Sequence, residues 1–222
     1  MLGFNIMRIL INIPIVLVSL TVHEFAHGWV SSKQGDPTPK MTGRLTLNPF
    51  AHIDPIGMVL MILTGFGWAK PVTVDPRYYK NKKRGMALTA IAGPLTNFIM
   101  AFVGILLSFG LKLLAIYLML KQGTDIKFLA QAAGFFDYFA QINLCFMVFN
   151  LIPIPPLDGA KVLGMFLPDR VYYNMLQYER YAMLIIMALA ITGVFGSIIG
   201  YGVSIVYNGI WNVLTGFIRL IL

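Results

Sequence analysis

Residues 6–30 read IMRILINIPIVLVSLTVHEFAHGWV, an apolar run that contains two histidines and a glutamate near its end. As a helix with a rise of 1.5 Å per residue, this run is ~38 Å long, enough to cross the ~30 Å hydrocarbon core of a bilayer. Ionisable residues inside such a span are costly and usually functional. The stretch therefore predicts a transmembrane helix that contains functional residues.

The composition of the whole chain indicates a membrane protein. Of its 222 residues, 58% are hydrophobic and 12% are charged, whereas ordinary soluble domains have about 25% charged residues. Further long apolar runs cover about residues 86–111, 128–152 and 181–207, and a weaker run covers 210–222. We expect one membrane-embedded domain over residues 1–222, without an appended soluble domain.

Residues 56–67, IGMVLMILTGFG, form an apolar run that is too short to cross. As a helix it would be only ~18 Å long, so we interpret it as re-entrant. The loops at 31–55, 68–85 and 153–180 then share one side, and they carry 3, 6 and 3 of the 17 Lys and Arg residues. The positive-inside rule makes that side cytoplasmic. The predicted location is a cell membrane, with several passes.

The remaining local patterns complete the expected fold. Residues 67–79, GWAKPVTVDPRYY, combine two prolines with three consecutive β-branched residues, which predicts a short edge strand or hairpin. Gly196 and Gly200 form a small-xxx-small pair, which favours helix packing within the domain over a homodimer seam. The predicted fold class is an all-α polytopic membrane protein with about five to six spanning or re-entrant helices and this short β-element.

The net charge of +8 does not indicate nucleic-acid binding. Six of the basic residues lie between positions 70 and 84, beside apolar segments. Retention of these residues on the cytoplasmic side explains their number. We therefore expect a lipid bilayer and membrane proteins as partners, and no nucleic acid.

His23, Glu24 and His27 form the pattern H-E-x-x-H. Helical positions i and i+4 lie about 40° apart on one face, so both imidazoles can bind one zinc ion while Glu24 points at a water beside it. The alternative is a buried histidine pair that only forms hydrogen bonds to neighbouring helices. Three ionisable residues within one membrane span favour the metal site.

Catalytic zinc normally has three protein ligands and an open fourth position. Candidates for the third ligand are His52, Asp54, Asp137 and Asp158. Asp158 follows the third long span, so the topology returns it to the membrane side where the first helix ends. Asp137 lies nearer the opposite surface, and His52 and Asp54 are expected to shape the turn of the re-entrant segment. The topology therefore favours Asp158.

Five motifs occur in an order that resembles one protein family: HEFAH, GRLTLNPFAHIDPIG, GWAKPVTVDPRYY, IAGPLTN and FNLIPIPPLDG. Together they resemble the site-2 proteases, which are intramembrane zinc metalloproteases, in a short form without a PDZ or CBS domain. The resemblance spans about residues 15–165. It implies hydrolysis of peptide bonds within or near transmembrane segments of membrane proteins, as in regulated intramembrane proteolysis.

The same resemblance implies roles for particular residues. One zinc ion per chain would be held by His23, His27 and Asp158, with Glu24 as the catalytic acid and base. The family also suggests a substrate or oxyanion contact for Asn150, although hydrogen bonding between helices explains this residue nearly as well.

Two other functions fit part of the pattern. In a metal transporter the histidines and aspartates would form a transit site, but their clustering toward one side leaves no relay to the other surface. In a catalytically inactive scaffold the chain would only bind transmembrane partners, but an intact Glu24 and a complete ligand set argue against this.

Overall fold

The computed structural model describes residues 6–58, 67–122, 125–178, 181–182, 185–186, 188–189 and 192–221. These residues are predominantly helical, and among them no regular β-strand occurs. A single antiparallel bridge between Ile53 and Ala69 stands where the sequence suggests a hairpin. The hairpin itself stays a prediction.

Three helices in the described residues are long and apolar enough to cross a membrane. They are α1 (Ile6–Lys33), α4 (Lys82–Gln122) and α5 (Lys127–Leu151). They confirm the first three apolar runs and a membrane location. The total of five to six spanning or re-entrant helices stays a prediction.

The structure of the C-terminal region differs from the expectation. Instead of a span at 181–207 and a separate run at 210–222, one helix, α9 (Val194–Ile221), covers most of both runs. A turn at Thr192 and Gly193 precedes it, and Gly193 has a φ of 75°. This left-handed conformation favours glycine and interrupts a helix. Hydropathy alone does not register such an interruption, because the apolar residues continue through it.

The expected re-entrant segment at 56–67 lies mostly outside the described residues. The structure shows a helical turn at residues 55–58, where the Asp54 Oδ1 atom accepts hydrogen bonds from the Ile56 and Gly57 amides. Residues 69–75, which we call the strap, run without helix or strand from Ala69 to Asp75.

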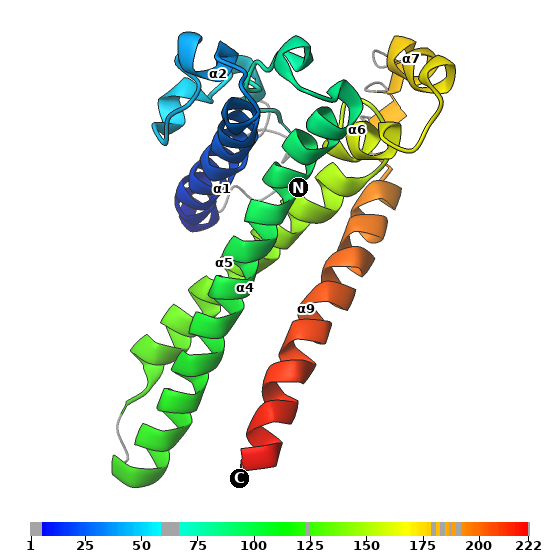
Figure 1. Ribbon diagram of the computed structural model, residues 1–222. Coiled ribbons are helices and arrows are strands. Elements are labelled where there is room, and N and C mark those ends of the chain that lie inside the picture. The colour runs from blue at the N-terminus through cyan, green and yellow to red at the C-terminus, as the bar shows by residue number, and fades with distance from the viewer. Residues whose placement is uncertain are drawn as a thin grey trace.

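The helices form an elongated bundle with all the large loops at one end (Figure 1). α4 and α5 pack against each other, with α1 beside α4 and α9 mainly against α5. At one end of this bundle, which we call the loop end, lie the short helices α2 (Thr38–Met41), η1 (Pro49–Ala51), η2 (Pro76–Tyr78), α6 (Asp158–Gly164) and α7 (Asp169–Gln177). Loops that the sequence analysis assigns to one membrane side therefore gather together.

Small side chains hold α4 and α5 close together. Ala101 and Ala140 are fully buried between the two helices, together with Ile105 and Leu144. Small residues permit close helix approach, which supplies packing energy in a bilayer where the hydrophobic effect is weak. The resulting rigid pair carries α6 back to the loop end, beside the last turns of α1.

Candidate metal centre

Helix α1 presents His23 and His27 one turn apart on the same face. Their Nε2 atoms are 3.0 Å apart and both side chains are buried. The two residues lie 10 and 6 residues before Lys33, the last residue of α1, or roughly 9–15 Å below the helix end at 1.5 Å per residue. The imidazoles therefore lie below the loops and not among them.

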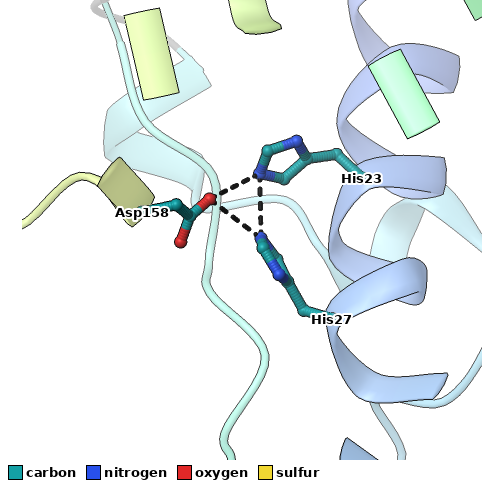
Figure 2. Close-up of side chains that lie close together, drawn as sticks. All are labelled: His23, His27 and Asp158. Carbon is teal, nitrogen blue, oxygen red and sulfur yellow. Dashed lines mark hydrogen bonds and ion pairs between the residues drawn. The ribbon is translucent and has the colours of Figure 1, made fainter. Parts of the chain in front are cut away.

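Asp158, the first residue of α6, completes a cluster with the two histidines (Figure 2). Its Oδ2 atom is 3.3 Å from Nε2 of His23 and 3.0 Å from Nε2 of His27. Asp158 is only 6% exposed. These three side chains form the one group of metal-ligand type found among the described residues.

The hydrogen bonds behind the imidazoles fix which nitrogen carries a proton. Nδ1 of His23 is 2.6 Å from Oδ1 of Asn97, and Nδ1 of His27 is 2.7 Å from the carbonyl oxygen of Thr89. The Asn97 amide is oriented by its NH₂ group, which donates to Oδ1 of Asn143. Both partners of the histidines are acceptors, so each Nδ1 must be the donor. The neutral rings therefore direct Nε2 lone pairs at each other and at the carboxylate.

This donor set fits a zinc ion. Three lone-pair atoms lie within 3.3 Å of one another, and such an arrangement is repulsive unless a cation is shared. Ligands 2.0–2.1 Å from one tetrahedral zinc lie roughly 3.4 Å apart, close to the observed spacing. Three protein ligands also leave a fourth position open, as in catalytic sites.

A cavity of about 140 Å³ adjoins the cluster. Besides the three clustered side chains, Glu24, Asn150 and Lys161 contribute to its wall, and the strap contributes Pro71, Val72 and Val74. Oε2 of Glu24 accepts a hydrogen bond of 2.8 Å from the Val72 amide. The cavity is large enough to hold water at the cluster.

Comparison with known proteins identifies the family. Residues 11–194 match the sequence profile of Peptidase family M50. The chain belongs to this family. It is 40% identical over 182 residues to "Putative zinc metalloprotease YwhC" of Bacillus subtilis, covering 80% of this chain and 78% of that protein.

More distant M50 relatives are longer or archaeal. "Putative zinc metalloprotease Rip2" of Mycolicibacterium smegmatis is 27% identical over 79% of this chain and 64% of its own length. "Putative zinc metalloprotease MJ0611" of Methanocaldococcus jannaschii is 30% identical over 72% of this chain and 73% of its own length. No solved structure matches this M50 chain. Membership confirms the resemblance noted above and the expected enzyme class, a zinc metalloprotease.

Gly93 on α4 makes the close approach of the two imidazoles possible in this M50 chain. A Cβ atom at this position would lie 2.6 Å from Nε2 of His23 and closer still to Nε2 of His27. Both imidazole rings therefore occupy space that any other residue would fill. The sequence alone does not reveal this contact.

The other candidate ligands lie elsewhere in the M50 chain. Nε2 of His52 donates to the Thr46 carbonyl, and Asp54 caps the turn at residues 55–58. Asp137 forms an ion pair with Lys112 on α4 and accepts a hydrogen bond from the Tyr207 hydroxyl on α9. None of the three belongs to the cluster in the part of the chain that the structure describes.

Several contacts at the M50 site have no signature in a single sequence. The Thr89 carbonyl and the Val72 amide are backbone atoms, so no residue type identifies them in advance. Lys161, whose Nζ lies 3.2 Å from Oδ1 of Asp158, had a signal in its spacing of three residues on a helix. Asn97 had a signal as well, because a buried amide in an apolar helix needs a partner.

Proposed function

We propose that this chain is an intramembrane zinc metalloprotease that hydrolyses peptide bonds within or near transmembrane segments of membrane proteins. One observation carries this proposal: His23, His27 and Asp158 converge beside Glu24 at a cavity below the end of a membrane-spanning helix. The names of the relatives support zinc as the metal.

The geometry supports a role for each of these residues. His23, His27 and Asp158 hold one zinc ion, which when bound polarises a carbonyl group and makes water acidic enough to attack at neutral pH. Glu24 borders the same cavity, takes a proton from the attacking water and delivers it to the leaving amine.

Asn150 is proposed as a substrate contact. Its side-chain NH₂ group donates to the Phe146 carbonyl one turn earlier on α5, while the side chain borders the cavity. An amide NH₂ group has two hydrogens. The second hydrogen can donate to the oxygen of the scissile carbonyl as negative charge develops on it.

The strap gives the proposed enzyme a means to hold an extended substrate. A helical substrate hides its amides, so it must unwind locally before its carbonyl reaches the metal. Pro71, Val72 and Val74 border the cavity in a segment without helix or strand, and an extended peptide can add to such an edge by β-augmentation. The expected short hairpin would form around this edge.

We further propose that the loop end faces the cytoplasm and that the chain spans the cell membrane several times. Its three large loops carry 12 of the 17 Lys and Arg residues, which the positive-inside rule assigns to the cytoplasmic side. A homodimer remains an expectation. A Cβ atom added at Gly196 or Gly200 would meet nothing within 4 Å among the described residues, so packing within the domain does not account for their spacing.

The test uses purified protein in detergent with a panel of single-span membrane proteins. Wild type should cleave at least one of them, a chelator should abolish cleavage, and metal analysis should find one zinc per chain. Glu24→Gln should abolish turnover and retain zinc. Wild type that cleaves no member of the panel, or full turnover by Glu24→Gln, would overturn the proposal, and metal flux retained by Glu24→Gln would indicate a transporter.

A further inference from the structure

Asp36, in the loop after α1, is a buried carboxylate that the proposed chemistry does not use. It is 1% exposed. Its Oδ2 atom accepts hydrogen bonds from the Ser31 hydroxyl at 2.6 Å and the Asp75 amide at 2.8 Å, and Oδ1 accepts from the Thr38 amide at 2.9 Å. All three donors are neutral. Burial raises the pKa of Asp36, but these hydrogen bonds outweigh it and hold the pKa below 3.8.

A buried charge without a cation is expensive, so its position calls for an explanation. Among the described residues no Lys, Arg or His forms an ion pair with Asp36. A neutral side chain could satisfy the Thr38 amide at a turn. Both terminal atoms of a carboxylate accept hydrogen bonds, whereas one terminal atom of an Asn amide only donates, so Asn in this position could not accept all three of these hydrogen bonds.

The Asp75 amide that Asp36 binds is the downstream end of the strap. The upstream end is fixed at Lys70, whose amide donates to the His52 carbonyl at 2.9 Å and whose carbonyl accepts from Arg44 at 3.4 Å. Between these ends, the Val72 amide donates to Glu24. The strap is therefore held at both ends, with its middle directed at the carboxylate proposed to act as the base.

The same anchor is connected to the metal cluster through side chains. The Ser31 hydroxyl lies 2.7 Å from the Tyr79 hydroxyl, which lies 3.1 Å from the Thr89 hydroxyl. The carbonyl of Thr89 in turn accepts from His27. Asp36, the strap and α4 thus form one hydrogen-bonded unit next to the cavity.

We propose that Asp36 is a positioning residue that sets the strap in register with Glu24, so that a substrate strand paired with the strap presents its carbonyl to the metal cluster. This inference rests on the proposed function. Asp36 acts through the strap and does not contact the reacting atoms.

The test compares Asp36→Asn with a matched control, Asp75→Asn. In Asp36→Asn one acceptor oxygen becomes an NH₂ group, so either the Thr38 amide or the Asp75 amide loses its acceptor, and the remaining hydrogen bonds no longer end on a charged group. Asp75→Asn makes the same chemical change at the end of the strap but keeps the backbone amide that Asp36 binds. The Asp75 side chain accepts from Arg77, which is exposed, and this change leaves the anchor in place.

Amide hydrogen exchange of the purified full chain, followed by mass spectrometry, measures the anchor without substrate. Because hydrogen bonds to charged groups are strong, we expect strap peptides in Asp36→Asn to exchange about tenfold faster or more than in wild type. Asp75→Asn should match wild type, and all three proteins should hold one zinc. With a substrate that wild type cleaves, Asp36→Asn should raise KM several-fold more than it lowers kcat.

The two proposals fail in distinguishable ways. Absence of cleavage by wild type would defeat the proposed function, whereas the exchange rates still decide whether Asp36 anchors the strap. Unchanged strap exchange in Asp36→Asn would overturn the present inference. If Asp36→Asn does not fold, amide exchange of the wild-type strap is the test. A wild-type strap that exchanges as fast as an unprotected loop is not anchored, and this result would overturn the inference.

Discussion

Replacing Gly93 with alanine adds a single methyl group where α4 faces the two histidines. The new Cβ atom would lie 2.6 Å from Nε2 of His23, whereas ordinary contacts begin at 3.4 Å. The imidazole or the helix must therefore move by about 0.8 Å, and a metal site tolerates deviations of only about 0.2 Å. We expect Gly93→Ala to damage zinc binding while leaving the helix intact.

The size of the effect follows from packing energetics. Overpacking a well-packed site costs about 1–3 kcal/mol, and with a factor of ten for each 1.4 kcal/mol this predicts a roughly 5- to 150-fold loss of zinc affinity. Helix propensity acts in the opposite direction, because alanine is favoured over glycine by about 1 kcal/mol inside a helix. Zinc binding that is weaker while the stability of the chain is unchanged would therefore indicate this contact.

Competition with a chromogenic chelator measures the affinity of purified protein in detergent. Gly110→Ala is the matched control, since it lies on the same helix and its Cβ atom would meet nothing within 4 Å. The control should bind zinc as wild type does. Wild-type affinity in Gly93→Ala would refute the close approach of the imidazoles to α4, and with it the geometry of the site.

Three further predictions concern the groups around the site. Asn97→Ala removes the acceptor that orients His23. Because outer partners of ligating histidines typically contribute 10–100-fold to metal affinity, chelator competition should show a loss of zinc affinity of about 10–100-fold. Unchanged zinc affinity would contradict the assigned tautomer of His23. Asp137→Asn leaves Lys112 without its carboxylate, so thermal unfolding should show that the free energy of unfolding falls by about 1–2 kcal/mol, while the zinc content stays unchanged. Loss of zinc would contradict the separation of the Asp137–Lys112 ion pair from the metal cluster. Because the pKa of Asp36 is lowered from 3.8, its stabilisation of the strap is complete above about pH 5 and disappears only as the pH falls through the lowered value. Exchange protection of the strap, corrected for intrinsic rates, should follow this course, and loss near pH 6 would contradict it.

The parts of the fold that were predictable are those that depend on composition over a long window. The runs at 6–30, 86–111 and 128–152 correspond to α1, α4 and α5 because a membrane span needs about 20 apolar residues, whatever their order. The boundaries predicted for the C-terminal helices were wrong because a single turn at Gly193 decides where α9 begins. A turn of this kind leaves the hydropathy of the window unchanged.

At the site, the sequence predicts contacts that depend on residue type and spacing, and it does not predict contacts that depend on the backbone or on how loops fold. H-E-x-x-H places His23 and His27 on one helix face by geometry alone, and the topology returns Asp158 to that end of the bundle. The Val72 amide and the Thr89 carbonyl belong to the backbone, which is the same for every residue type. Asp36 has an ordinary loop sequence, and its burial depends on how residues 34–38 fold against η2 and α4.

The ligands of the proposed centre are synthesised at different times, because His23 and His27 lie far upstream of Asp158 in the chain. His23 and His27 belong to α1, whereas Asp158 follows α4 and α5 and is synthesised only after both of those helices. A nascent chain that ends before α6 thus has both imidazoles but lacks the Asp158 carboxylate. The proposed protease therefore gains its third metal ligand only after α6 has been made, which keeps it inactive during the earlier stages of its own synthesis.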